Sequence, residues 1–280
     1  MNYVEKNQEI LNRWKAQFCA DKSQESEYKD CNPADNFAED GIMNKGDFYL
    51  DEDICKRHPC GKENELWTKA PLRVLFLSKE PSNIAWDVRT ETFYQKGEGL
   101  PPQNNEISES QFYQNEAVAL YGLFHTNIES GIPDYYGITW EQALKFSDEQ
   151  IFARINCKKE PGSHTSVISN LNQEINKYWM FLSEQIQNID ADVIICSGKS
   201  YLIHKLNAIY KSSFEQFPSI PCAWYNKKEN KLAIDSYHLA YNRRKGADLI
   251  VYHSILDPYY EFIKQYPYFL KEIKSKRTNR

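Results

Sequence analysis

Short apolar runs that alternate with longer helical stretches constrain the fold of this chain more than any other feature. The runs LRVLFLS (72–78), IFARINC (151–157) and ADVIICSG (191–198) have the length and β-branched content of buried strands. Residues 171–189 and 247–265 carry apolar side chains at helical spacing. The alternation predicts an α/β fold with a central, mainly parallel four-stranded sheet and helices on both faces.

The remaining segments complete the predicted organisation. Residues 3–18 and 199–210 are expected to form helices, and 221–236 a hairpin whose second half is the fourth strand. Thr139 and Gln142 fit a capping box at the start of a further helix. The predicted division is 1–70, an N-terminal helix and irregular Cys-containing extension; 71–270, the α/β core; and 271–280, a basic, frayed tail.

Composition excludes several classes of protein. The 280 residues contain no apolar run long enough to span a membrane, and the polar N-terminus lacks the apolar core of a signal peptide. Seven cysteines, an odd number, argue against a disulfide framework. We therefore expect a cytoplasmic monomer. A net charge of −5 argues against a nonspecific basic DNA coat, but local patches can still bind DNA.

Polar residues follow each expected strand at the point where it ends. In open α/β sheets, ligands bind at the carboxyl ends of the strands. The segments that follow the four strands are, in chain order, Ser78-Lys79-Glu80-Pro81, Asn156-Cys157-Lys158, Ser197-Gly198-Lys199-Ser200 and Asp235-Ser236-Tyr237-His238. An acid, an amide, a glycine-containing turn and a histidine are thus expected at one edge of the sheet.

Glu80, Asn156 and His238 are the candidates for chemistry at this edge. Pro81 favours an extended Glu80 that projects its carboxylate into the cleft. The amide of Asn156 offers a donor and an acceptor to the edge of a base. His238 can hydrogen-bond charge that develops on a leaving group. The plainer interpretations are a solvated loop Glu, a turn Asn bonded to its own loop, and a satisfied buried His.

Other patterns carry weaker signals. Lys158, Lys159 and the cluster 243–245 can hold phosphates, although such runs are more often solvated. SGKS at 197–200 is similar to a P-loop, but Val193 stands where a P-loop needs its first glycine. No G-x-S-x-G elbow of a serine hydrolase is present in the sequence.

One group of thiol and imidazole side chains is tightly spaced. Cys55, His58 and Cys60 lie within a few residues of one another, whereas the other cysteines are irregularly spaced. Zinc sites use thiolates two to four residues apart. A metal centre here is a minor alternative to reduced, unligated thiols, and no cofactor is expected.

The order of these motifs resembles that of the uracil-DNA glycosylase-like superfamily. Members carry a Gly-Gln-Asp-Pro turn after a strand, where this chain has 78–81; a base-binding Asn, matched by Asn156; and a His after a strand, matched by His238. A divergent bacterial branch also shares an Asp-Gly-Ile opening, as at 40–42, and a stretch similar to 154–166. The resemblance covers roughly residues 38–265.

This resemblance includes departures from the family pattern. The acid is Glu80 rather than Asp, Ser78 and Lys79 replace Gly and Gln, and His238 is followed by Leu239-Ala240 rather than Pro-Ser. Uracil is therefore not the expected base, and the loop that contacts DNA is expected to differ.

The resemblance implies hydrolysis of the N-glycosidic bond of a base flipped out of DNA, without a cofactor. Glu80 would stabilise the sugar cation and orient water, His238 would hydrogen-bond the departing base, and Asn156 would bind the base edge. A stacking aromatic, Trp86 or Phe93, and phosphate contacts complete the implied site. The implied substrate and DNA contacts are Lys79, Pro81, Trp86, Phe93, Lys158, Ser197, Gly198, Lys199, Arg243 and Arg244.

Long segments at 19–70 and 82–150 are larger than a minimal glycosylase requires. They favour a pocket for a bulky or modified base, such as a modified cytosine in phage DNA, and hence a role in antiviral defence. Two alternatives stay open. One is a catalytically inactive nucleic-acid or nucleotide-binding module of the same fold, and the other is a hydrolase of a nucleoside or sugar.

Overall fold

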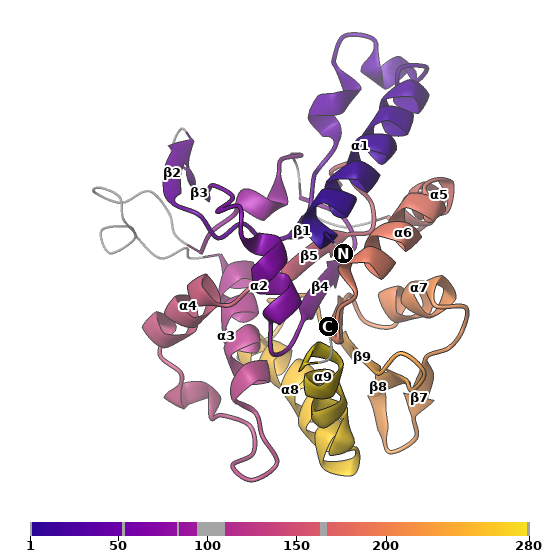
Figure 1. Ribbon diagram of the computed structural model, residues 1–280. Helices are drawn as coiled ribbons and strands as arrows, with labels where there is room; N and C mark the ends of the chain where they lie inside the picture. The colour runs from indigo at the N-terminus through magenta and orange to yellow at the C-terminus, as the bar shows by residue number, and fades with distance from the viewer. Residues whose placement is uncertain (1, 52–53, 83, 94–109, 163–166, 279–280) are drawn as a thin grey trace.

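A mixed sheet of seven strands lies at the centre of the fold (Figure 1). The computed structural model describes residues 2–51, 54–82, 84–93, 110–162 and 167–278. The strands of this sheet are β1 (Gly41–Ile42), β4 (Val74–Ser78), β5 (Ala153–Asn156), β6 (Val193–Ser197), β7 (Glu215–Phe217), β8 (Ile220–Asn226) and β9 (Lys231–Ser236). Their spatial order is β1-β5-β4-β6-β9-β8-β7.

The sheet is larger and more mixed than the sequence predicts. Neighbouring pairs among β5, β4, β6 and β9 are parallel, whereas β1, β8 and β7 join the sheet antiparallel. The predicted hairpin 221–236 is present as β8 and β9. The strands that were missed, β1 and β7, have two and three residues. Runs that short show no measurable alternation of side chains, and they form only because a longer neighbour pairs with them.

Helices cover both faces of the sheet. They are α1 (Tyr3–Lys22), α2 (Glu63–Lys69), α3 (Gln111–His125), α4 (Trp140–Glu149), α5 (Ile168–Lys177), α6 (Trp179–Ile189), α7 (Tyr201–Ile209), α8 (Ala247–Gln265) and α9 (Tyr268–Thr278). Successive strand residues point to opposite faces. Leu75 and Leu77 therefore pack with α1, α2, α5, α6 and α7, while Val74 and Phe76 pack with α3, α4, α8 and α9. Among the helices that the structure describes, none combines the length and apolar character needed to cross a membrane.

Some of the predicted helices have the bounds that the sequence indicated, and others do not. The predicted helix 247–265 is α8, and Thr139 and Gln142 form the predicted capping box of α4. The predicted helix 171–189 is instead two helices, α5 and α6, which meet at Tyr178. The N-cap of α5 is Val167, and it makes no side-chain capping hydrogen bond.

The two terminal regions are more ordered than expected. The segment 19–70, predicted to be irregular, contains β1, α2 and a hairpin of β2 (Phe48–Asp51) and β3 (Ile54–Arg57). The segment 271–278, predicted to be frayed, lies in α9, while 279–280 lie outside the described residues. Phe269 and Ile273, four residues apart, are buried and anchor α9 to the core.

Candidate active site

A cavity of about 580 Å³ lies at the carboxyl ends of β4 and β5. Ser78 and Asn156 are paired at the ends of these parallel strands, so the residues that follow them start at the same level. Glu80, Asn156 and His238 all line the cavity, together with Pro81 and Trp86. The structure thus brings together the three candidates that the sequence places after three different strands.

Glu80 is held in place on two sides. Its carboxylate forms an ion pair with Lys158 at 3.3 Å, and both side chains are largely buried. A Cβ at Gly162 would lie 2.2 Å from the Glu80 carboxyl carbon, so only glycine permits this approach. The Gly162 amide also donates to the Pro81 carbonyl at 2.9 Å. Lys158, expected to contact phosphate, is instead engaged by Glu80 and by Glu160 at 3.6 Å.

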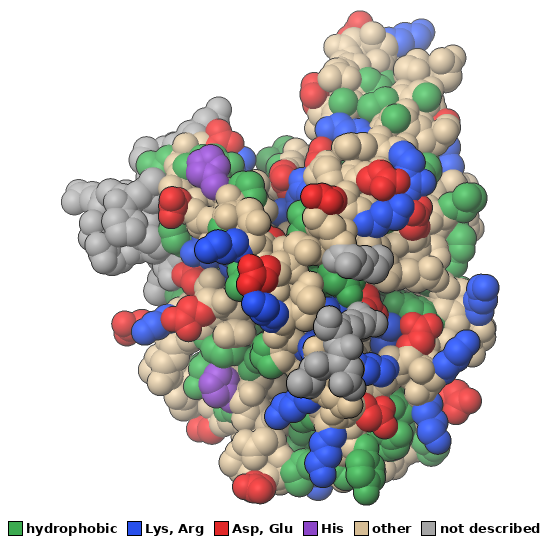
Figure 2. Space-filling view, viewed as in Figure 1, with side chains coloured by type: hydrophobic (Ala, Val, Ile, Leu, Met, Phe, Trp, Pro, Cys, Tyr) green, Lys and Arg blue, Asp and Glu red, His purple; other side chains and the backbone are tan. Residues whose placement is uncertain are grey.

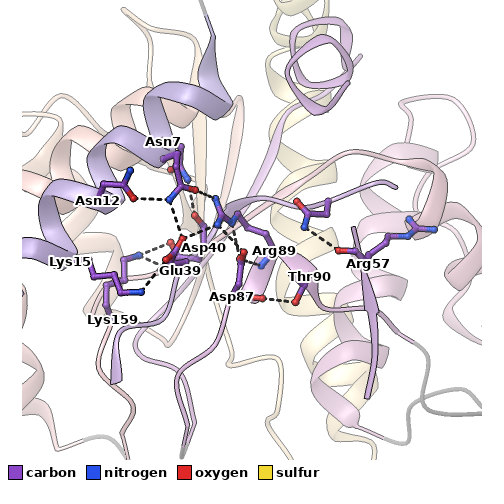
Figure 3. A network of polar contacts seen from close by, with 12 residues as sticks. Asn7, Asn12, Lys15, Glu39, Asp40, Arg57, Asp87, Arg89, Thr90 and Lys159 are labelled. Carbon is purple, nitrogen blue, oxygen red and sulfur yellow. Dashed lines mark hydrogen bonds and ion pairs between the residues drawn. The ribbon is translucent and has the colours of Figure 1, made fainter. Parts of the chain in front are cut away.

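A buried ion pair positions Asn156 through its backbone (Figure 3). The Asn156 amide N–H donates to the Asp40 carboxylate at 2.8 Å, and its carbonyl accepts from Lys159 Nζ at 2.9 Å. Lys159 contacts both Asp40 oxygens at 2.6 and 2.7 Å, and desolvation lowers its pKa. Lys159 is buried and does not serve as a phosphate contact. Within the described residues the Asn156 side-chain amide has no hydrogen-bond partner, so both its donor and its acceptor are available to a ligand in the cavity.

His238 presents one nitrogen as a donor. Burial, and then the nearby charge of Lys79, lower its pKa, so the neutral ring is favoured near pH 7. The Ala240 amide donates to Nδ1 at 3.2 Å, which leaves the proton of the neutral ring on Nε2. The Phe112 ring lies 6.0 Å from the His238 ring, centroid to centroid. The cavity therefore has an imidazole N–H donor beside an aromatic surface.

Another part of the lining was missed by the sequence interpretation. Glu91, Phe112, Tyr113 and Arg154 all face the cavity. The guanidinium of Arg154 contacts Glu91 and lies 5.4 and 5.3 Å from the Phe112 and Tyr113 ring centroids. Burial is the main cause that raises the pKa of Glu91, and the nearby charge of Arg154 acts in the opposite direction. The sequence did contain one signal for this group. Arg154 stands inside an otherwise apolar strand, and a buried cation needs a carboxylate partner.

The N-terminal extension fixes the Trp86 side of the cavity through Glu39, whose contacts with Arg89 are drawn in Figure 3. Glu39 donates its backbone N–H to the Trp86 carbonyl at 3.1 Å and accepts from the Val88 N–H at 2.8 Å. Arg89 contacts Glu39 at 3.0 Å and Asp87 at 2.7 Å through its side chain. Residues 39 and 40 thus hold Trp86 and Asn156 at the same time, so the extension is part of the site.

Several predicted contacts lie away from the cavity. Phe93 is 4% exposed and packs on Phe152 at 6.4 Å, so the expected stacking role for Phe93 is wrong and Trp86 is the aromatic candidate of the two. Ser197 is buried, and its hydroxyl accepts from the Leu239 N–H at 3.1 Å. Lys199 bonds the Tyr237 hydroxyl at 2.7 Å. Gly198 lies between these two residues in the chain, and its backbone N–H donates to the Ser236 carbonyl at 3.2 Å.

Exposed cations follow His238 in the chain. Arg243 and Arg244 lie exposed in the turn between β9 and α8 and make no ion pair with the described residues. On the face shown in Figure 2, basic and acidic side chains are interspersed rather than gathered into one basic surface.

The residues considered for a metal do not form a ligand cluster. Cys55 is buried, and the His58 ring stacks on Tyr49 at 4.1 Å. Cys60 accepts from the Lys62 amide at 3.4 Å. In the part of the chain that the structure describes, no group of three or more His, Cys, Asp or Glu side chains is arranged to hold a metal ion.

Comparison with protein-family models, curated proteins and solved structures finds no significant match for this chain. Its interpretation therefore rests on the motifs and on the geometry of the cavity.

Proposed function

We propose that this chain is a DNA glycosylase that hydrolyses the N-glycosidic bond of a flipped-out damaged or modified base and leaves an abasic site. One observation supports the proposal most strongly. Glu80, Asn156 and His238 reach the same cavity from three different strands. A volume of about 580 Å³ is within the range of pockets that enclose small ligands, and it leaves room for a base with a substituent.

Each of the three residues has a chemical role in this reaction. As the glycosidic bond breaks, the sugar gains positive charge and the base leaves with the bonding electrons. The Glu80 carboxylate stabilises the cation and orients the water that attacks the sugar carbon. The Nε2–H of His238 hydrogen-bonds the base as its negative charge develops. The Asn156 amide holds the base edge, and Trp86 offers a face for stacking.

The fold supports the same proposal. Four neighbouring strands, β5, β4, β6 and β9, run parallel, and the candidate residues follow three of them. We infer that these strands form a uracil-DNA glycosylase-like core, to which β1, β8 and β7 are added at the edges.

A binding module without catalysis is the second candidate, and the Lys158 contact favours it. Lys158 partly neutralises Glu80, so this carboxylate would stabilise a sugar cation less than an unpaired one. Such a module would still bind a base through Asn156, His238 and Trp86.

Base release from defined DNA separates the two candidates. The substrates are single-stranded oligonucleotides that contain uracil, a deaminated purine, or hydroxymethylated or glucosylated cytosine. Wild type is compared with Glu80→Gln and with the control Glu160→Gln, which removes a carboxylate from the same Lys158 but does not line the cavity. Release of one base by wild type and by the control, but not by Glu80→Gln, supports the glycosylase. Binding without release supports the module.

A further inference from the structure

One carboxylate of a buried ion-pair network lines the cavity. Arg154 is the partner of two carboxylates, Glu116 and Glu91. Glu116 is fully buried, and its two oxygens accept from Arg154 Nε at 2.7 and 3.0 Å. Glu91 lines the cavity, whereas Glu116 does not. Glu116 therefore holds the guanidinium from the side away from the cavity, and Glu91 presents its carboxylate to the cavity.

The hydrogen-bonding capacity of the cavity is therefore asymmetric. His238 contributes an N–H donor, and Asn156 contributes both a donor and an acceptor. An ionised Glu91 can only accept. Arg154 donates to the Glu91 oxygen Oε2, and among the described residues no hydrogen bond reaches Oε1, so this oxygen is available to a ligand. Trp86 and Tyr113 also line the cavity, and their aromatic rings keep this acceptor in apolar surroundings.

We propose that Glu91 makes this site selective for bases that carry an exocyclic amino group, over the same bases with an oxo group in its place. This inference rests on the proposed function and specifies its substrate class. An amino group donates to the free acceptor position of Glu91. An oxo group placed there brings two acceptors together without a proton between them, and a buried site of this kind rejects the mismatched analogue strongly.

The test uses two matched oligonucleotides that differ only in the target base, 5-hydroxymethylcytosine or 5-hydroxymethyluracil. The measured quantity is the ratio of kcat/KM for the amino base to that for the oxo base. We expect a ratio of ~10–100 for wild type, the range for one well-placed polar pair. Glu91→Gln should lower the ratio about tenfold, because its amide can also donate to an oxo group. Glu116→Gln removes the same charge from Arg154 outside the cavity and should leave the ratio unchanged.

A binding measurement keeps the inference separate from the proposed activity. Calorimetry with the two free bases as probes should give the same preference for the amino form, reduced in Glu91→Gln only. Release from neither oligonucleotide counts against the glycosylase, while the binding ratio still decides the inference. An equal affinity for the two probes, binding of neither, or a ratio that Glu91→Gln leaves unchanged overturns it. If Glu91→Gln does not fold, the wild-type ratio alone decides.

Discussion

The two ends of the parallel strands both carry buried ionic groups, but they use them differently. At the amino ends, Arg73 contacts Asp190 at 3.1 Å, and Lys231 contacts the same carboxylate at 2.6 Å. The other donors of Arg73 bond the Trp67 and Thr68 carbonyls. At the carboxyl ends, the side-chain amide of Asn156 is unpaired within the described residues, and Glu91 shares one guanidinium with Glu116. We call the first network closed, because each of these named groups has a protein partner. The second network leaves groups that a ligand can satisfy.

This difference separates stability from function. Where every buried polar group has a partner, the network holds elements together and a ligand gains nothing by approaching. Where the network is incomplete beside a cavity, the remaining hydrogen-bonding capacity selects a ligand. Substitutions at the amino ends should therefore change the free energy of unfolding, whereas substitutions at the carboxyl ends should change turnover.

The largest effect is expected at the closed network. Arg73→Met should lower the free energy of unfolding by about 3 kcal/mol, because it leaves Asp190 with Lys231 alone and removes the donor of the Trp67 and Thr68 carbonyls. Urea denaturation measures this loss. Lys69→Met is the control, since the Lys69–Glu65 pair is exposed and its loss should cost less than about 1 kcal/mol. Equal losses in the two variants would contradict the distinction between a closed core network and a surface pair.

At the cavity, removal of a single donor should leave stability nearly intact. His238→Ala should lower kcat for base release by about 10²–10³-fold, the usual cost of losing one preorganised donor at a developing negative charge. Single-turnover kinetics and a melting curve of the same sample measure both properties. A variant that keeps full activity would remove His238 from the mechanism.

The glycine beside Glu80 offers a smaller test. Gly162→Ala places a Cβ against the Glu80 carboxyl carbon, where the distance would be 2.2 Å, so the carboxylate must move. We expect kcat to fall about tenfold or more, because small displacements of a catalytic group have large effects on rate. Gly137→Ala is the matched control, since its added Cβ would meet its neighbours at 3.7 Å, an ordinary contact. Identical activities in both variants would show that the Glu80 position is not critical.

The smallest effect is a pH dependence of base selectivity. Burial raises the pKa of Glu91, and the groups that face it are Arg154, Glu116 and Tyr113. As the pH falls, Glu91 takes up a proton earlier than an ordinary Glu and becomes a donor as well as an acceptor. The preference for an amino base should therefore weaken toward acid pH. The ratio of kcat/KM between pH 5 and pH 8 measures this, and it should be flat in Glu91→Gln.

The sequence predicted the parts of the site that depend on strand ends. Glu80, Asn156 and His238 follow apolar runs whose strand character is local, so their common edge could be expected. The predicted stacking role failed for Phe93, because an aromatic residue after a strand has the same local pattern whether it packs in a core or lines a cavity. It also missed Glu91, whose position in the cavity depends on Arg154, which lies 63 residues away in the chain.

The sequence by itself determined the alternation of strands and helices, the capping box at Thr139 and the residues that end each strand, because these depend on side chains a few positions apart. Only the tertiary structure decided which of those residues share a cavity and which charges are paired. Lys158 and Lys159 are neighbours in the chain, yet one pairs with Glu80 beside the cavity and the other with buried Asp40. Pairing of this kind is set by strand order and packing across distant segments, and local spacing carries no record of either.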